Sequence, residues 1–244
     1  MLSKNQIKLI NSLQQKKYRN LHGLFIVEGK KSVNEFLQSD FELESLFVLE
    51  NQEVKTKSQE INKIVINSNE LKKISALKNA NQVLAVFKIP KNIELVNNGL
   101  ILALDDIKDP GNLGTIIRLC DWFGIKQLVC SLETVDCYNP KVVQASMGSL
   151  TRVNILYTDL KVYLSKTELP IYTTLLEGEN VYKSKLPKDA IIIMGNEANG
   201  ISDTISSFST NKITIPNFSK TKQTESLNVA MATSIVLSEF KRDK

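Results

Sequence analysis

The stretch DDIKDPGNLGTIIRLCDWFG, residues 105–124, decides how the second part of the chain folds. It follows a short apolar run, LILAL (100–104), and contains GNLGTIIR (111–118), which holds two glycines, an asparagine and an arginine. An apolar strand that ends in acids and glycines and then becomes a helix typically presents its backbone to a ligand. The G-x-x-G spacing differs, however, from the G-x-G-x-x-G of dinucleotide-binding folds.

Arg118 stands out on the helix that we predict over about 112–123. Apolar side chains occupy one face of this helix: Ile116, Leu119, Cys120 and Phe123. At 100° per residue, Arg118 lies about 200° from Ile116 and points away from that face. An arginine in the first turns of a helix also opposes the preference of the macrodipole for acids. We interpret Arg118 as a candidate functional residue, with a solvated surface arginine as the alternative.

The second part of the chain alternates apolar strands with helices. Strands are predicted at LILAL (100–104), QLVC (127–130), VNILY (153–157), IYTTLL (171–176), AIIIMG (190–195) and KITI (212–215). Further helices are predicted at 139–149, with Pro140 in the first turn, and at 226–241. Nearly continuous apolar strands between helices are typical of a parallel sheet covered on both faces, so the predicted fold class is α/β.

The first part of the chain has a shorter, mixed pattern, which predicts a small αβ domain. Helices are predicted at 4–15, 30–39 and 68–77, and strands at 24–29, 45–50, 63–67 and 83–89. Ser68 is expected to cap the third of these helices. The proline, asparagines and glycine of KIPKNIELVNNG (88–99) predict a linker between the two parts.

The net charge of +5 lies in the first part of the chain. Residues 1–97 hold 15 Lys/Arg against 10 Asp/Glu, whereas residues 98–244 hold 16 of each. A basic surplus with few histidines favours a polyanionic partner, and nucleic acid is the first choice. The alternative is a proteome that is generally rich in lysine.

Neither a membrane segment nor a metal site is predicted. The apolar runs are four to six residues long, against the roughly 20 that a membrane helix needs. The start, MLSKNQIKLINSLQQKKYRN (1–20), is too polar for a secretory signal, so we expect a cytoplasmic protein. Cys120, Cys130 and Cys137 lack C-x-x-C spacing, and with His22 they make no zinc set. We expect buried, reduced thiols and a histidine in a surface or packing role.

Two more strands are followed by unusual polar loops. In AIIIMGNEANGISD (190–203), two glycines surround an acid and two amides, which predicts a tight turn with exposed backbone donors. In ITIPNFSKTKQTESLNVA (213–230), Pro216 and a polar loop precede the last helix. Taken alone, the first loop has a simple β-turn as the alternative to a functional role, and Ser226 or Asn228 has a simple helix cap as its alternative.

Three motifs in this order and spacing carry a family resemblance. They are N-L-G-x-x-x-R (112–118), M-G-N-E-x-x-G-I-S (194–202) and I-P…E-S-L-N-V (215–229). Together they resemble the SpoU (TrmH-like) RNA 2′-O-ribose methyltransferases of the SPOUT superfamily. YNPKVVQASMGSL (138–150) is similar to the family's segment between the first two motifs. KKYRNLHGLFIVEGKKSVNEFL (16–37) resembles a substrate-binding domain related to ribosomal proteins L30 and L7Ae.

The resemblance implies an architecture and a cofactor. It implies an L30/L7Ae-like RNA substrate-binding domain over 1–92 and a SPOUT methyltransferase domain over 98–244, with a trefoil knot in its mostly parallel sheet. It also implies a homodimer that holds S-adenosylmethionine bent in the knot by backbone groups. Gly195, Ile215 and Leu227 match the cofactor-binding positions.

The resemblance also implies a reaction, methyl transfer to a ribose 2′-hydroxyl of a structured RNA, with rRNA favoured over tRNA. Arg118 matches the residue that acts at the hydroxyl. Because a guanidinium stays protonated, we expect Arg118 to pair with the adjacent phosphate and orient the hydroxyl. The other matching polar positions are expected to hold Arg118 and to shape the knot loops: Asn112, Glu197, Ser226 and Asn228. Glu197 near Arg118 would be an orienting carboxylate.

One departure and three alternatives remain open. Nine residues without glycine, NFSKTKQTE (217–225), separate I-P from S-L-N, where family members usually have about six with a glycine. This longer basic loop either reaches RNA or changes the cover of the cofactor. The alternatives are a non-catalytic RNA-binding protein with this fold, a Rossmann-type oxidoreductase, and a resistance-type rRNA methyltransferase.

Overall fold

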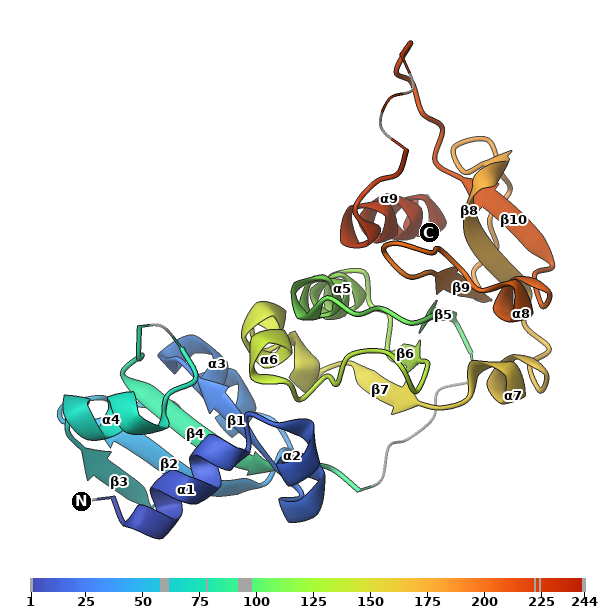
Figure 1. The fold of residues 1–244 in the computed structure, drawn as a ribbon. Coiled ribbons are helices and arrows are strands. Elements are labelled where there is room, and N and C mark those ends of the chain that lie inside the picture. The colour runs from blue at the N-terminus through green and yellow to red at the C-terminus, as the bar shows by residue number, and fades with distance from the viewer. Residues whose placement is uncertain are drawn as a thin grey trace. The chain divides into compact units, whose positions relative to one another are not determined.

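The chain folds into two compact units in a computed structural model that describes residues 2–57, 62–77, 79–91, 98–221, 223 and 225–242. The first unit comprises Met1–Asn92 and Asp136–Thr151, and the second comprises Ile93–Val135 and Arg152–Lys244. Half of the predicted linker, residues 92–97, lies outside the described residues. Each unit has its own sheet (Figure 1).

The first unit is a four-stranded sheet covered by helices. Its elements are α1 (Lys4–Ser12), α2 (Lys16–His22), β1 (Leu24–Glu28), α3 (Lys30–Leu37), β2 (Leu43–Leu49), β3 (Lys63–Ile66), α4 (Ser68–Ile74), β4 (Val83–Lys88), α6 (Pro140–Ser146) and the 3₁₀ turn η1 (Ser149–Thr151). The strand order is β1-β4-β2-β3, and only β2 and β3 among these neighbours run parallel. The αβ prediction for this part is therefore confirmed.

One helix boundary and one helix cap in the first unit differ from the sequence prediction. The helix predicted over 4–15 is confirmed as α1 but ends at Ser12, because the chain turns at the fully buried Leu13; α2, which begins at Lys16, was not predicted. The cap of α4 is Asn67 and not Ser68, since the Asn67 side chain accepts from the Glu70 N–H while the Glu70 carboxylate accepts from the Asn67 N–H. This reciprocal pair is a capping box, and asparagine serves in it as well as serine.

Residues 136–151 fold with the first unit, although the domain predicted over 98–244 includes them. Arg19 is 1% exposed, and its Nε and Nη2 donate to Asp136 Oδ2 at 2.9 and 2.5 Å. Its Nη1 donates to the Leu13 carbonyl at 2.8 Å. The Phe25 ring lies 4.6 Å from the Tyr138 ring, centroid to centroid. This segment therefore completes the core of a unit from which it is distant in sequence.

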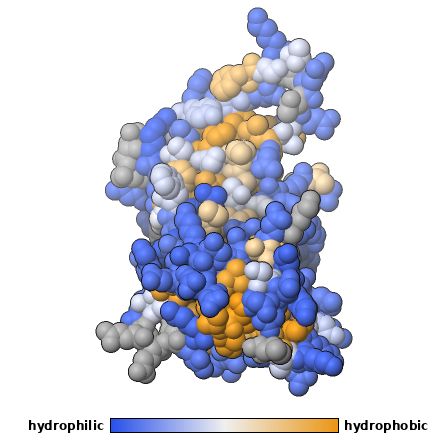
Figure 2. All heavy atoms as spheres, turned by 90° about the vertical axis from the view of Figure 1, so that its left-hand side faces the viewer, coloured by the Kyte–Doolittle hydropathy of each residue, from blue (hydrophilic) through white to orange (hydrophobic). Residues whose placement is uncertain are grey.

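The apolar core of the first unit is not sealed everywhere. Val65 is 57% exposed on β3, which is an edge strand. Figure 2 shows hydrophobic side chains gathered in one area of the face that this unit turns to the viewer, bordered by hydrophilic ones. His22 is exposed at the end of α2, and Cys120, Cys130 and Cys137 are buried, as the sequence predicts.

The second unit is a six-stranded parallel sheet, which confirms the predicted α/β fold class. Its elements are β5 (Leu100–Leu104), α5 (Pro110–Trp122), β6 (Gln127–Cys130), β7 (Asn154–Tyr157), α7 (Leu160–Leu164), β8 (Ile171–Asn180), β9 (Ala190–Met194), α8 (Asp203–Ser206), β10 (Asn211–Thr214) and α9 (Val229–Lys241). The strand order is β10-β8-β9-β5-β6-β7. Helices α5 and α9 contact each other, and α7 and α8 pack on the other face (Figure 1). The sequence did not predict α7 or α8.

The strand order places a topological switch point between β5 and β9. From β5 the chain continues to β6 on one side, whereas from β9 it continues to β10 on the other side. Ligands of open α/β sheets bind in the crevice outside the carboxyl ends of strands at such a point. The trefoil knot stays a prediction. None of the helices in the described part of the chain is long and apolar enough to cross a membrane.

Candidate active site

The three sequence motifs converge at the switch point of the second unit. Asn112 lies in the first turn of α5, after β5; Glu197 lies in the loop after β9; and Asn228 is the N-cap of α9. The Asn112 Nδ2 donates to Glu197 Oε1 at 2.9 Å, and the Asn228 Nδ2 donates to Asn112 Oδ1 at 3.0 Å. We call these three residues the amide–carboxylate cluster. It joins segments that are 85 and 116 residues apart in the chain.

Helix caps fix the orientation of the two amides. Asp109 caps α5 and accepts from the Asn112 N–H at 2.8 Å, with Pro110 in the first turn. The Asn228 Oδ1 accepts from the N–H groups of Ala230 and Met231, which leaves its amide nitrogen for Asn112. Asn228 is therefore a helix cap, as one alternative held, and also a bridge between motifs. The last helix begins at Val229, later than predicted.

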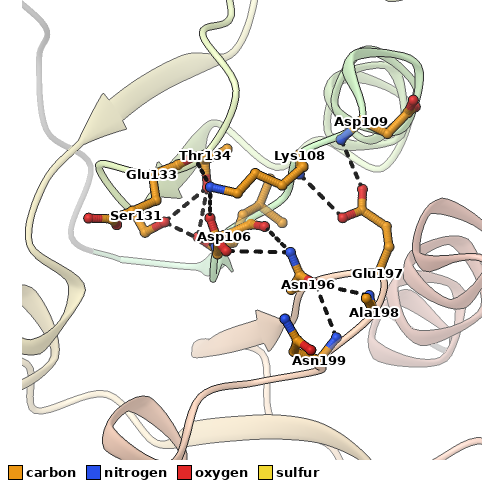
Figure 3. Close-up of polar contacts among 11 residues, drawn as sticks. Asp106, Lys108, Asp109, Ser131, Glu133, Thr134, Asn196, Glu197, Ala198 and Asn199 are labelled. Atoms are coloured by element: carbon orange, nitrogen blue, oxygen red, sulfur yellow. Dashed lines mark hydrogen bonds and ion pairs between the residues drawn. The ribbon is translucent and has the colours of Figure 1, made fainter.

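The Glu197 carboxylate binds the start of α5. It accepts from the backbone N–H groups of Lys108 and Asp109, each at 3.2 Å (Figure 3). It also accepts from the Asn112 side chain. Desolvation alone would raise the pKa of Glu197, but the hydrogen bonds from Asn112 and from backbone N–H groups outweigh it and hold the pKa below its ordinary value. An ionised carboxylate also suits the positive end of a helix dipole.

A second polar network, which the sequence did not predict, holds the loops beside the cluster. The Asn196 Nδ2 donates to the Asp106 carbonyl at 2.6 Å, and its Oδ1 accepts from the N–H groups of Ala198 and Asn199 (Figure 3). Asp106 has a φ of 62°, and its N–H donates to Ser131 Oγ at 3.0 Å. The position of Asn196 between Gly195 and Glu197 in the second motif was the signal that could have identified it.

Lys108 adds a link to the loop after β6. Its ammonium pairs with the Asp106 carboxylate and donates to the Glu133 carbonyl at 2.9 Å (Figure 3). The loops that follow β5, β6 and β9 are thus tied together by side chains as well as by the sheet. Such cross-links keep the site in one arrangement before any ligand binds.

The turn at 195–200 requires glycine at its start. Asn196 and Gly200 exchange backbone hydrogen bonds, both at 2.9 Å. A Cβ at Gly195 would lie 2.2 Å from the Gly200 carbonyl carbon, which no side chain tolerates. The predicted tight turn is confirmed. Ile215 is half-buried and Leu227 is 50% exposed, and the role of these positions with Gly195 in cofactor binding stays a prediction.

Arg118 stands apart from the cluster. It is exposed, as predicted, and within the described part of the chain it makes no hydrogen bond or ion pair. The expected contact with Glu197 is not formed, because that carboxylate is bound to the start of α5. Arg118 is the ninth of thirteen residues in α5, so the argument from the macrodipole was wrong: the helix begins at Pro110, earlier than predicted. Ser226 is exposed and precedes the cap of α9.

The fold and the site define a parallel α/β protein with a polar ligand site at its topological switch point. The family model described as the SpoU rRNA Methylase family matches residues 99–238, and the MRM3-like substrate binding domain matches residues 4–85. The chain belongs to the SpoU rRNA methylase family.

Similar proteins cover the whole chain. The 23S rRNA (guanosine(2553)-2′-O)-methyltransferase RlmP of Bacillus subtilis is 26% identical over 241 residues, 96% of either chain. A solved structure of a protein of the TrmH family of RNA methyltransferases from Porphyromonas gingivalis is 37% identical, with a TM-score of 0.90 over 100% of both chains. An AdoMet-bound rRNA methyltransferase from Sinorhizobium meliloti is 25% identical, with a TM-score of 0.85 over 99% of this chain and 96% of that one.

Proposed function

We propose that this protein transfers a methyl group from S-adenosylmethionine to a ribose 2′-hydroxyl of a structured RNA, and that the RNA is ribosomal. The amide–carboxylate cluster carries the proposal, because it brings the three family motifs to one site at the switch point. Membership of the SpoU rRNA methylase family and the similarity to RlmP support rRNA as the substrate.

The residues beside the cluster fit an adenosine moiety. The loop at 195–200 offers backbone groups, and Ile215 and Leu227 offer apolar surface. Backbone donors and acceptors recognise an adenine edge without charged side chains, and apolar surface covers its faces. We assign cofactor binding to Gly195, Ile215 and Leu227. When bound, S-adenosylmethionine supplies a methyl group that is already activated as a sulfonium.

The protein must therefore act on the acceptor, because a ribose hydroxyl is a weak nucleophile until it loses its proton. Arg118 is free of partners in the described part of the chain, so its planar guanidinium is available for the phosphate next to the target ribose. Bidentate pairing would orient the hydroxyl for attack, and the phosphate or a water would take the proton. Asn112, Glu197 and Asn228 hold the start of α5, the helix that carries Arg118. Ser226 is assigned to the same polar set.

The remaining assignments concern assembly and partners. The region 1–92 is assigned to RNA substrate binding, which its surplus of lysine and arginine supports. The region 98–244 is assigned to methyl transfer, and the protein is assigned as a cytoplasmic homodimer.

The test is methyl transfer from labelled S-adenosylmethionine to unmodified rRNA and tRNA pools, beside Arg118→Ala. We expect ribose-linked label in the rRNA pool and its loss in the variant. Label in the tRNA pool alone would contradict the choice of RNA. Absence of label from both pools, with a ribosomal assembly intermediate also unlabelled, would favour a non-catalytic RNA-binding protein.

A further inference from the structure

Two loops of the second unit present a stacked pair of aromatic rings to solvent. Tyr182 follows β8 and Phe218 follows β10, and their ring centroids are 6.4 Å apart with 27° between the ring planes. Phe218 is 80% exposed. We call this pair the aromatic platform. A phenylalanine this exposed adds little to the core of the fold, and its ring face is accessible to a ligand.

The inner ring of the aromatic platform is held in place by the sheet. Val181 is fully buried, and its N–H donates to the Thr214 carbonyl of β10 at 3.0 Å. The Tyr182 N–H donates to Asn180 Oδ1 at 2.9 Å, and the Lys183 N–H donates to the Asn180 carbonyl at 2.9 Å. Tyr182 therefore rests on a fixed turn, and Phe218 stacks on it with its outer face in water.

Lysines accompany both rings. Lys183 and Lys185 follow Tyr182, and Lys220 follows Phe218; all three are exposed. None of them makes an ion pair with another described residue. Aromatic faces between unpaired cations are the usual composition of a surface for single-stranded nucleic acid, since bases stack on the rings and phosphates meet the cations.

The position of the aromatic platform also favours RNA binding. Strands β10, β8, β9 and β5 are parallel neighbours, so the loops after β8 and β10 leave the same edge of the sheet as the loops that carry the amide–carboxylate cluster. An RNA strand that lies along this edge would pass both the aromatic platform and the amide–carboxylate cluster.

We propose that the aromatic platform binds an unpaired nucleotide of the RNA that the enzyme methylates, with the base on Phe218 and the neighbouring phosphates on Lys183, Lys185 and Lys220. The identity of the RNA rests on the proposed function, but the stacking site does not need catalysis. Because every base has an aromatic face, the site tolerates any sequence and serves to hold the strand.

The first test compares Phe218→Ala with Phe218→Tyr in the full chain, using a short fluorescein-labelled single-stranded RNA as the probe. Loss of a base-stacking ring weakens affinity by roughly five- to a hundred-fold, whereas tyrosine keeps affinity within about two-fold because it keeps the ring. Leu176→Ala is the matched control, since Leu176 is 74% exposed on β8 without a ring. Replacing Lys183 and Lys220 by glutamine should flatten the salt dependence of binding by about 0.7 in slope per lysine.

The second test uses the single tryptophan of the chain, Trp122, which is 84% exposed. Trp122→Phe combined with Phe218→Trp moves that fluorophore to the aromatic platform. We expect saturable quenching when the RNA is added. RNA binding without quenching would overturn the proposal. A blue shift that depends only on protein concentration would also overturn it, because a second copy of the protein would then cover the ring.

The two proposals can fail separately. Intact methyl transfer with unchanged RNA affinity in Phe218→Ala would refute the aromatic platform alone. Quenching without any methyl transfer would refute the proposed function and leave the aromatic platform supported.

Discussion

Arg19 and Arg118 occupy opposite environments in the two units of the molecule. Arg19 is 1% exposed and binds Asp136 and the Leu13 carbonyl, whereas Arg118 is exposed and unpaired within the described residues. A buried charge is stable only when it has a partner. Asp136 and the Leu13 carbonyl are the partners that allow Arg19 to be buried. Nothing in the fold needs Arg118. The contrast teaches that a side chain with satisfied hydrogen bonds builds the molecule, and that one kept free beside an organised site is available to a ligand.

The largest effect is expected from Arg19→Ala. Removal of one partner from a buried ion pair leaves Asp136 without its charge partner and leaves a cavity, which should lower the free energy of unfolding by about 3–5 kcal/mol. Chemical denaturation of the full chain measures this. Methyl transfer per folded molecule should stay near wild type. A loss below about 1 kcal/mol would show that the pair does not anchor residues 136–151.

Arg118→Ala should have the opposite effect to Arg19→Ala: it should lower activity and leave stability unchanged. We expect kcat/KM for rRNA to fall about 100- to 1,000-fold, as for other removed transition-state donors, while the melting temperature stays unchanged because the side chain is exposed. Arg118→Lys is the sharper control. It keeps the charge but not the planar fork, so it should recover only part of the activity. Full activity of Arg118→Lys would sink the bidentate role.

Glu197→Gln tests whether the amide–carboxylate cluster acts through its charge. The variant keeps the shape but loses charge-assisted bonds at the start of α5, which should cost no more than about 1 kcal/mol because Glu197 is exposed and water screens its charge. The folded-state pKa of Glu197 lies below its unfolded value, so its contribution is present above the unfolded pKa and is lost as pH falls through the folded pKa. Between neutral and acid pH, thermal unfolding of the wild type should therefore lose more stability than that of Glu197→Gln. Parallel curves would contradict this.

The sequence predicted the features that follow from local residue patterns, namely the apolar strands and the three motifs. The strands of the second unit were found because buried parallel strands are continuous apolar runs, and the three motifs identified Asn112, Glu197 and Asn228 before any geometry was known. Helices α7 and α8, with five and four residues, escaped because such short segments show no helical period.

The sequence could not predict which polar groups would meet. Glu197 was expected beside Arg118 but binds the Lys108 and Asp109 N–H groups, because the backbone that leads into α5 offers unpaired donors that no residue pattern shows. The same holds for residues 136–151, whose place in the first unit depends on Asp136 meeting Arg19, 117 residues away. Contacts of this range follow from the whole fold and not from local spacing.

The smallest expected effect is the difference in stability between alanine variants of two neighbouring residues of the first unit, Asn67 and Ser68. Asn67→Ala removes a cap whose side chain accepts from the Glu70 N–H at 3.0 Å, so it should cost about 0.5–1 kcal/mol. Ser68→Ala changes an exposed position inside the first turn and should be neutral or slightly stabilising, since alanine favours a helix. Urea denaturation of both variants measures the difference. Equal losses would mean that Ser68 shares the cap. A loss confined to Asn67 would show that even at the surface a satisfied hydrogen bond, and not the residue type, marks the side chain that builds the fold.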